Sequence, residues 1–346
     1  MRDIYDISNY NYTLDERLIA QKPLEKRDIS KLLILNRKTG EITHDKFFNI
    51  YKYFDDEDCL VLNNTKVLPA RLFGTKSKTG AKIEILFLDF KKEKIAEVIM
   101  KNSRRVVDGD FIEFPAGLVA RVVEKHGKTV EVEFNFGKKE FFKILKKYGV
   151  IPLPPYIKED KFSPKHKEIY QTVYAKKEGA KAAPTAGLHF TKDLVKKLKQ
   201  KGIEITHITL HTGLGTFEPL LEKDIREHKM HKEYFEINKI SAEKINLALK
   251  NKKSVIAAGT TSLRAIEHCT QNGKVMPQKG KTDLYIYPGY EFKIVNKLIT
   301  NFHLPKTTLF ILVCAFAGID NIKKAYSEAI KEKYRFYSYG DAMLIL

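Results

Sequence analysis

The chain has 346 residues, 43% of them apolar and 30% charged, which is typical of a soluble globular protein with two domains. Its longest uncharged apolar run, Leu309 to Ile319, is shorter than the ~20 residues needed to span a bilayer. Asp3 and Asp6 stand where a signal peptide would carry positive charge. We therefore exclude a secreted or membrane-spanning protein and expect a cytoplasmic one.

The formal charge is +19, from 62 Lys and Arg against 43 Asp and Glu. Such an excess favours a polyanionic partner such as RNA, DNA or an acidic membrane, although a generally lysine-rich surface would give the same count. The three cysteines, Cys59, Cys269 and Cys314, are scattered. They predict neither a disulfide framework nor a paired-cysteine metal site.

Near the N-terminus, Tyr12 to Ala20 is expected to form a short helix that ends before Pro23. Lys31 to Leu35 and Asp58 to Asn64 are apolar runs of strand length. The second run ends in two asparagines, so polar side chains follow a buried strand.

Residues 71–150 have a different pattern, with short alternating runs separated by turn residues. In the clearest run, Val130, Val132 and Phe134 share one face and Glu131 and Glu133 the other. This pattern predicts a small antiparallel β-barrel or sandwich. The block carries 18 Lys and Arg against 11 Asp and Glu, which suits a nucleic-acid surface or a solvated structural insert equally well.

The proline-rich stretch from Ile151 to Tyr156 marks a domain boundary. We therefore predict an α/β catalytic domain made of residues 1–70 plus 151–346, with residues 71–150 inserted as a barrel. In the α/β part, Thr191 suits a helix N-cap, and Ile203 to Leu210 alternates like a half-buried strand. Ser254 to Ala258 is a further apolar strand that runs into Gly259 to Ser262, and a helix is expected to begin near Ser262.

Four polar loops border these apolar segments: Pro184 to Thr191, His211 to Thr216, Gly259 to Ser262 and Thr300 to Pro305. Each combines small residues with Thr, Asn, Ser or His. Ligands bind at the carboxyl ends of strands in open α/β sheets, so we expect the loops to converge on one pocket. A glycine and three hydroxyl residues before a helix also make a ready site for an anion or polar ligand.

Metal chemistry has a weak basis in this sequence. A metal-dependent hydrolase could use His211, His228, His231 and His303, but His-x-x-His without companion cysteines or carboxylates is not a specific signal. A non-catalytic RNA-binding protein built on the basic barrel is the second alternative. A protein that only binds RNA would not need the polar loops.

Motifs along the whole chain resemble one enzyme family. They include LVLNNTKVLPARLFG (60–74), AAPTAGLHFT (182–191), THITLHTGLGTFEP (206–219), AAGTTSLRAIE (257–267), LITNFHLPKTTLFILVCAFAG (298–318) and YRFYSYGDAMLI (334–345). In this order they are similar to the S-adenosylmethionine:tRNA ribosyltransferase-isomerases of queuosine biosynthesis. The chain departs from the usual family residues at Asp15, Lys158, Thr212 and Thr307, where Pro, Arg, Val and Ser are usual.

The resemblance implies an α/β domain with an inserted β-barrel. It also implies transfer and isomerisation of the ribosyl part of S-adenosylmethionine onto 7-aminomethyl-7-deazaguanine at the tRNA wobble position, giving epoxyqueuosine-tRNA, adenine and methionine. S-adenosylmethionine is then a consumed substrate, the partner is the tRNA that carries this base, and no cofactor or metal is needed. We expect a monomer without a membrane association.

The candidate site residues come from the polar loops. His189 and His303 are the candidates for proton transfer, because histidine titrates near neutrality. Asp341, among aromatic residues, could offset the sulfonium charge. The candidate substrate-binding residues are Pro184, Thr185, Gly187, His211, Gly213, Gly215, Thr216, Gly259, Thr260, Thr261, Ser262, Arg264, Asn301 and Asp341.

Overall fold

The structure, a computed structural model, describes residues 3–158, 160, 162–213 and 219–346. The chain divides into two compact units. The α/β unit consists of Met1–Lys66, Pro154–Glu159 and Gln171–Leu346, and the barrel unit of Val67–Leu153 and Asp160–Tyr170. The predicted fold class, an α/β domain with an inserted small antiparallel β-barrel, is confirmed.

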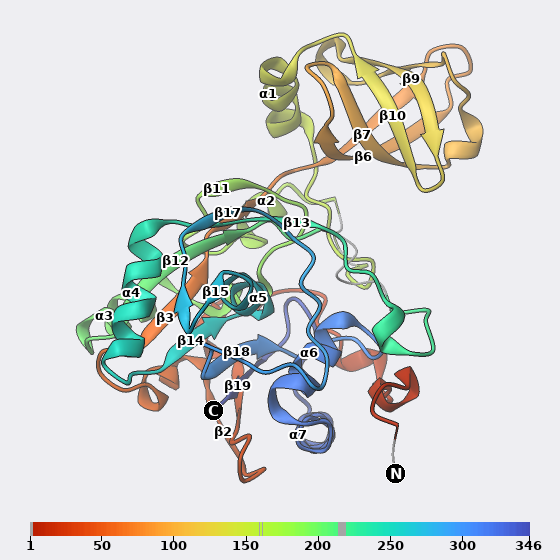
Figure 1. Cartoon of the computed structure of the whole chain (residues 1–346). Coiled ribbons are helices and arrows are strands. Elements are labelled where there is room, and N and C mark those ends of the chain that lie inside the picture. Colours follow the sequence, from red (N-terminus) through yellow and green to blue (C-terminus); the bar gives the residue numbers. More distant parts are fainter. Residues whose placement is uncertain (1–2, 159, 161, 214–218) are drawn as a thin grey trace. The chain divides into compact units, whose positions relative to one another are not determined.

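The barrel closes in the order β10-β7-β6-β5-β8-β9, with every neighbouring pair antiparallel (Figure 1). Its strands are β5 (Arg71–Lys76), β6 (Lys82–Phe90), β7 (Ile95–Lys101), β8 (Phe111–Glu113), β9 (Val119–His126) and β10 (Thr129–Phe134). Val130, Val132 and Phe134 are buried as the alternation predicts. Helix α1 (Lys138–Tyr148) places the ring of Phe141 4.6 Å from that of Phe134, so the helix joins the barrel core.

In the α/β unit, the described residues form a sheet of nine strands in the order β17-β13-β12-β3-β14-β18-β19-β1-β2. The strands are β1 (Lys31–Leu35), β2 (Ile42–Lys46), β3 (Cys59–Asn63), β12 (Glu204–Leu210), β13 (Glu233–Ile237), β14 (Val255–Ala258), β17 (Gln278–Thr282), β18 (Lys297–Asn301) and β19 (Ala342–Ile345). The pairs β12-β3, β3-β14 and β14-β18 are parallel, while β19 runs antiparallel to β18 and parallel to β1. The carboxyl ends of the central strands therefore share an edge with the starts of β19 and β1.

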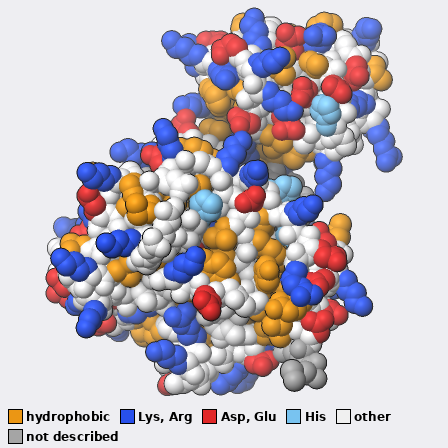
Figure 2. All heavy atoms as spheres, in the orientation of Figure 1, with side chains coloured by type: hydrophobic (Ala, Val, Ile, Leu, Met, Phe, Trp, Pro, Cys, Tyr) orange, Lys and Arg blue, Asp and Glu red, His pale blue; other side chains and the backbone are white. Residues whose placement is uncertain are grey.

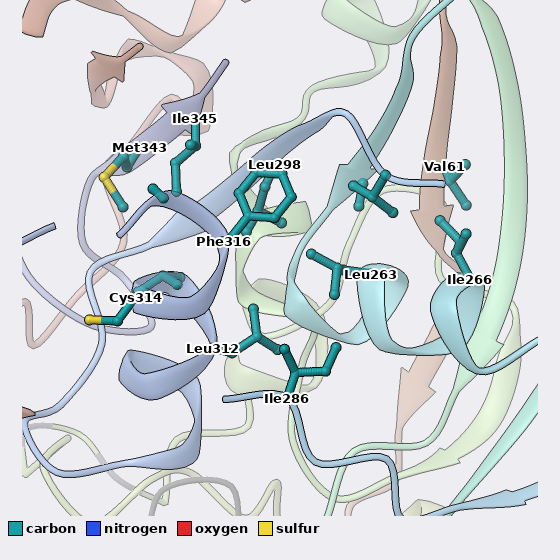
Figure 3. Packing of buried hydrophobic residues seen from close by; sticks show 14 of the residues in the cluster. Val61, Leu263, Ile266, Ile286, Leu298, Leu312, Cys314, Phe316, Met343 and Ile345 are labelled. Carbon is teal, nitrogen blue, oxygen red and sulfur yellow. The ribbon is translucent and has the colours of Figure 1, made fainter. Parts of the chain in front are cut away.

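Apolar side chains cover both faces of this sheet. On one face, Leu263 of α5 (Thr260–His268) and Leu312 and Phe316 of α6 (Thr308–Ala317) pack with the strand residues Val61 and Leu298 (Figure 3). A second cluster forms the opposite face from Leu60, Leu62 and Ile256 with Phe190 and with α3 (Lys192–Gln200). Burial on both faces explains why β3 and β14 are continuous apolar runs rather than alternating ones.

The remaining helices and short strands complete both units. They are α2 (His166–Ile169), α4 (Lys239–Lys250), α7 (Ile319–Lys331), β4 (Thr65–Val67), β11 (Lys177–Ala180), β15 (Thr270–Gln271), β16 (Lys274–Val275) and the 3-10 turns η1 (Ile7–Tyr10), η2 (Glu16–Leu18), η3 (Arg27–Ile29), η4 (Phe47–Tyr53), η5 (Ser103–Arg105), η6 (Pro115–Gly117), η7 (Thr185–His189) and η9 (Ile225–Glu227). Within the described residues, the helices include none long and apolar enough to cross a membrane.

One sequence expectation about local structure is wrong. Tyr12 to Ala20 is not a helix, because only Glu16–Leu18 makes a single 3-10 turn, capped by the Asp15 side chain. Helix α4 is capped by Asn238, and the hydroxyl of Ser241 donates to the backbone oxygen of His207 over 2.7 Å. By contrast, the predicted Thr191 N-cap is confirmed, since its Oγ1 accepts from the backbone nitrogen of Leu194.

Candidate active site

The ends of the central strands place polar side chains at one edge of the sheet. Asn63 ends β3, Leu210 leads into Thr212, Ala258 leads into Gly259, and Asn301 ends β18. The side chain of Asn63 fixes this edge, because its Nδ2 donates to the Leu210 carbonyl and its Oδ1 accepts from the Leu210 nitrogen. The loops are thus held together by the register of parallel strands that lie far apart in the sequence.

Two small hollows lie between these loops, within the α/β unit. The Gly259 hollow is lined by residues that include Pro184, Thr185, Gly259, Thr260, Thr261, Asn301 and His303. The Tyr156 hollow is lined by residues that include Tyr156, Thr185, Asn301, His303, Tyr337 and Ser338. Thr185, Asn301 and His303 line both, so the two hollows adjoin. Their cavity volumes of about 30 and 20 Å³ have room for only one or two water molecules each.

His303 is buried where the hollows meet, and its backbone is held at both ends. Its nitrogen donates to the hydroxyl of Tyr326 over 2.8 Å, and its carbonyl accepts from the hydroxyl of Tyr12. The ring Nε2 lies 2.7 Å from Oγ1 of Thr300, while no hydrogen bond to Nδ1 occurs in the described part of the chain. Burial lowers the pKa of His303 to about 3, so the ring is neutral at pH 7.

His189 is equally buried, but both of its ring nitrogens are engaged. Nδ1 lies 2.8 Å from Oγ of Ser30, Nε2 lies 3.1 Å from Nδ2 of Asn301, and the ring stacks on Phe47. Since the amide nitrogen of Asn301 can only donate, Nδ1 carries the ring hydrogen and donates to Ser30. Burial, with the nearby guanidinium of Arg335, lowers the pKa of His189 to about 3. His189 lines neither hollow.

Asn301 presents its amide oxygen as an unused acceptor. Its Nδ2 also lies within reach of the backbone carbonyls of Tyr337 (3.2 Å) and Asp341 (3.4 Å), and these two acceptors fix which amide atom is nitrogen. Among the described residues, Oδ1 of Asn301 and Oγ1 of Thr212 are buried and have no hydrogen-bond partner. Unpaired buried polar atoms are rare in folded proteins, and here both residues line the Gly259 hollow. The hollow is therefore suited to a polar ligand.

The start of α5 forms another wall of the Gly259 hollow. Gly259 has φ +92° and ψ 153°, a region that is essentially restricted to glycine, and it precedes the helix without a side-chain cap. The Thr260 and Thr261 side chains line the hollow, whereas the Ser262 hydroxyl donates to the Ala258 carbonyl and faces the helix interior. Uncapped N–H groups at a helix start favour negatively charged ligand groups.

Arg264, a predicted substrate-binding residue, is instead paired in the interior. Its Nη1 lies 2.5 Å from Oε2 of Glu233, and its Nε donates to the Leu284 carbonyl. The other oxygen of Glu233 accepts from the backbone nitrogen of Gly213 over 2.9 Å. Among the described residues of the loop after β12, Arg264 reaches Gly213 through Glu233, and its Nη2 is buried without a described hydrogen-bond partner.

Three other predicted residues line neither hollow. His211 stacks on Tyr234, its Nδ1 contacts Oγ1 of Thr65 at 2.7 Å, and burial lowers its pKa to about 4. Gly187 is required by packing, because a Cβ there would lie 2.3 Å from the hydroxyl of Tyr174. Asp341 accepts from the backbone nitrogens of Lys31 (2.8 Å) and Arg335 (2.7 Å), so its carboxylate is used to join β1 to the C-terminal turn.

Seven predicted residues are brought together around the hollows: Pro184, Thr185, Gly259, Thr260, Thr261, Asn301 and His303. Gly215 and Thr216 lie outside the described residues. His228, a candidate metal ligand, contacts Glu222 at 3.4 Å. Across residues 3–158, 160, 162–213 and 219–346, no three His, Cys, Asp or Glu side chains are grouped as metal ligands.

Several residues of this region were not predicted from the sequence. Ser30 and Glu233 act through contacts made only in the folded chain, and nothing in the local sequence distinguishes them. Tyr156 could have been predicted from its position, because it ends the proline-rich segment that leads back into the α/β unit. In the structure its hydroxyl lies 2.6 Å from that of Ser338. Thr300 could also have been predicted, since it directly precedes Asn301 in a polar loop.

The structure thus defines a protein of the α/β class with a polar-ligand site at the carboxyl ends of parallel strands. The model of the family described as "Queuosine biosynthesis protein" matches residues 7–345. The chain belongs to this family, which confirms the resemblance seen in its motifs.

Relatives of known name match over almost the whole chain. The S-adenosylmethionine:tRNA ribosyltransferase-isomerase of Clostridium kluyveri is 49% identical over 345 residues, covering 98% of this chain and 99% of the relative. The enzyme of the same name from Carboxydothermus hydrogenoformans is 49% identical over 341 residues, with the same coverage of both chains. The crystal structure of S-adenosylmethionine tRNA ribosyltransferase from Thermotoga maritima matches with a TM-score of 0.57 and 34% identity, covering 98% of this chain and 100% of that one.

Proposed function

We propose that the chain is an S-adenosylmethionine:tRNA ribosyltransferase-isomerase. It transfers and isomerises the ribosyl moiety of S-adenosylmethionine onto 7-aminomethyl-7-deazaguanine at the tRNA wobble position, and it releases adenine and methionine. The observation that carries the proposal is 49% identity to enzymes of this name over 98% of the chain. Buried polar groups in the Gly259 hollow that have no partner among the described residues support it, because they suit a polar ligand.

The reaction begins with proton removal. The sulfonium acidifies the hydrogens on the adjacent 5′-carbon of the ribose, and a base takes one of them. The amine of the modified base loses a proton as it forms the new bond to the ribosyl group, and the bond to adenine breaks as adenine takes up a proton. The carbon–sulfur bond breaks to release methionine, and the ribosyl carbons and ring oxygen close into the epoxy-cyclopentane of the product. The protein must supply a base, an acid for the departing adenine and shielding from water. The reaction so written uses S-adenosylmethionine as a substrate and calls on no metal ion.

His303 is the better placed of the two candidates for proton transfer. It lines both hollows, and its Nδ1 faces no hydrogen-bonding group in the described part of the chain. When Thr300 donates to the Asn301 carbonyl (3.3 Å), His303 donates from Nε2 to Thr300 and keeps a lone pair on Nδ1. His189 has no such nitrogen, so we assign it a positioning role between Ser30 and Asn301.

The substrate-binding assignments divide into residues that face the ligand and residues that hold them. Thr260 and Thr261 with the uncapped start of α5 suit the carboxylate of S-adenosylmethionine, and the Asn301 amide oxygen suits a donor on the ligand. Gly187, His211, Gly213, Ser262, Arg264 and Asp341 support this wall from behind. Gly215 and Thr216 remain predictions of ligand contact.

Neither hollow by itself accommodates the donor. Cavity volumes of about 20 and 30 Å³ do not accept a nucleoside, since drug-sized ligands occupy pockets of ~300 Å³ or more. The tRNA in turn is held largely through its phosphates by the basic surface, with Arg104 and Arg105 as candidate contacts. On the face shown in Figure 2, Lys and Arg side chains are spread over the surface with Asp and Glu among them.

The deciding experiment is nucleoside mass spectrometry. tRNA carrying 7-aminomethyl-7-deazaguanine is incubated with the protein and S-adenosylmethionine, with and without a chelator. The expected result is epoxyqueuosine in the tRNA together with free adenine and methionine in both samples. Absence of the product would overturn the proposed activity. Loss of activity in chelator that added metal restores would overturn the metal-free mechanism alone.

A further inference from the structure

The barrel unit carries a groove with a volume of about 710 Å³, far larger than either hollow of the α/β unit. Its lining includes Phe73, Lys82, Lys101, Asn102, Glu113 and Phe114, which come from β5, β6, β7 and β8 and their connections. We propose that this groove binds one unpaired nucleotide of the tRNA, with the base against Phe73 and the phosphates beside the lysines. The proposal rests on the proposed function, because that function makes tRNA the partner.

The floor of the groove is aromatic and is shaped by a glycine. A Cβ on Gly74 would lie 2.7 Å from the ring of Phe114 and 2.6 Å from the Glu113 carbonyl, so only glycine lets this ring and strand approach so closely. Phe114 is buried, whereas Phe73 is 42% exposed. An edge contact with Phe162, at 5.3 Å and 88°, supports the Phe73 ring while leaving it accessible.

The polar groups of the groove suit the edge of a base. Asn102 adopts a left-handed conformation with φ 60°, and its side chain caps nothing. In the described part of the chain, neither the Asn102 amide nor the Glu113 carboxylate has a hydrogen-bond or ion-pair partner. Glu84 differs, because Arg71 lies 2.8 Å from its Oε1. Amide and carboxylate groups pair with the edges of bases, and a carboxylate accepts hydrogen bonds from amino groups.

These features together favour a nucleotide over other ligands. Proteins recognise single-stranded RNA by stacking splayed-out bases on aromatic rings and by hydrogen bonds to their edges. Lys82 and Lys101 supply positive charge for the phosphates, and the Lys101 side chain stays 70% exposed although its Nζ lies 3.8 Å from Oε2 of Glu84. Glu113 would repel a phosphate, so we place it beside the base. The same carboxylate and Glu84 would repel an acidic peptide. A base with an amino group, such as cytosine or guanine, should be preferred over uracil.

The test measures RNA binding by the full-length protein, separately from turnover. The probe is a fluorescent RNA hairpin with a seven-nucleotide loop and no modified base, and its affinity is measured by anisotropy at fixed salt. Phe73→Ala should weaken binding roughly 5- to 150-fold, which is the usual effect of losing one base stack. Phe73→Leu keeps an apolar contact with Phe162 but should weaken binding similarly, so a folding defect cannot account for the loss. Glu113→Gln should change the preference among loop bases more than the overall affinity.

Two controls sharpen the outcome. Tyr148→Ala removes a ring of matched exposure (40%) on the barrel unit but outside the groove, and it should leave hairpin affinity unchanged. A blunt RNA duplex should bind wild type and Phe73→Ala equally, because paired bases do not reach the ring. Equal hairpin affinity of Phe73→Ala and wild type would overturn the proposal, and so would displacement of the hairpin by an acidic peptide in a Phe73-dependent manner.

The groove and the proposed activity fail in different ways. If the wild-type protein modifies tRNA while Phe73→Ala retains full hairpin affinity, the groove assignment is wrong and the activity stands. If the wild-type protein forms no epoxyqueuosine while Phe73→Ala loses hairpin affinity, the activity is wrong and the groove assignment stands.

Discussion

Asn301 donates from Nδ2 to Nε2 of His189 across 3.1 Å, and this contact connects the end of β18 to the loop that η7 forms. The other ring nitrogen of His189 reaches Ser30 just before β1. The backbone carbonyl of Asp341, just before β19, lies 3.4 Å from the same amide nitrogen. The neutral His189 and the Asn301 amide together therefore join three strand ends, and His303 is the imidazole that lines the hollows.

The first prediction separates the two histidines. His303→Gln should lose ~100-fold or more in turnover while it binds S-adenosylmethionine like wild type, because a group that only transfers a proton contributes little to ground-state binding. His189→Gln should weaken binding of S-adenosylmethionine and lower stability by ~1–3 kcal/mol, because buried partners lose a hydrogen bond. Calorimetric binding and single-turnover kinetics measure the two effects. A His189→Gln protein with intact binding and stability but no turnover would reverse the assignment.

The second prediction concerns acid. The pKa values of His189 and His303 are about 3 in the folded protein, against 6.5 for an ordinary histidine. Below pH 6.5 these two histidines bind protons in the unfolded chain but not in the folded chain. Their contribution to the free energy of unfolding is therefore fully present above pH 6.5 and is lost as the pH falls toward 3. The loss is ~2 kcal/mol for each histidine between pH 6.5 and 5. The urea midpoint followed by circular dichroism should fall over this range.

The two glutamine variants serve as controls for this pH dependence. Each removes one titrating ring, so each should show a shallower decline of the urea midpoint between pH 6.5 and 5 than the wild-type protein. A decline as steep as that of wild type in both variants would show that other groups control the acid sensitivity.

The third prediction tests the pair of Glu233 and Arg264, whose side chains are 6% and 4% exposed. Glu233→Gln keeps an acceptor for the Gly213 nitrogen but leaves a buried guanidinium without its counter-charge. Removing one partner of a buried ion pair costs ~3–5 kcal/mol. The double variant Glu233→Gln with Arg264→Met should recover most of that loss in chemical denaturation. A double variant as unstable as the single one would show that the charge pair is not the source of the effect.

The fourth prediction concerns the backbone before α5. Gly259→Ala should cost ~1–3 kcal/mol and weaken binding of S-adenosylmethionine, because φ +92° with ψ 153° is accessible essentially to glycine only. Crowding is not the cause, since the added Cβ would meet the Cβ of Ala186 at an ordinary 3.6 Å. Gly280→Ala is the matched control, because its Cβ would meet the Phe235 ring at the same 3.6 Å without a positive φ. Equal stability of the two variants would contradict the backbone argument.

The fifth prediction concerns the association with tRNA. With 62 Lys and Arg against 43 Asp and Glu, binding should weaken steeply with salt, because each neutralised phosphate releases counterions. Arg104→Ala and Arg105→Ala should each reduce the slope of log affinity against log salt by ~1 if they contact phosphates. Filter binding measures this slope between about 50 and 200 mM salt, where the effect of counterion release is large. A flat profile would rule out a phosphate-dominated contact.

The local sequence was sufficient to predict those strands in which the apolar residues are the ones buried in the fold. Val130, Val132 and Phe134 alternate into the barrel core, and β3 and β14 are continuous apolar runs because both faces of their sheet are covered. The N-cap at Thr191 could be read from one side chain. The segment around Glu16 could not, because its apolar residues pack in an irregular chain rather than along one helix face.

The sequence by itself also identified the family, through motifs that stay in order from one end of the chain to the other. It located the polar loops, because small and hydroxyl residues after apolar runs mark strand ends. Only the tertiary structure decided which side chains face the hollows. His189 and His303 have the same local signal, and they differ because Ser30 and Asn301 occupy both nitrogens of one ring. Those contacts link residues more than a hundred positions apart, and strand register, not local propensity, brings them together.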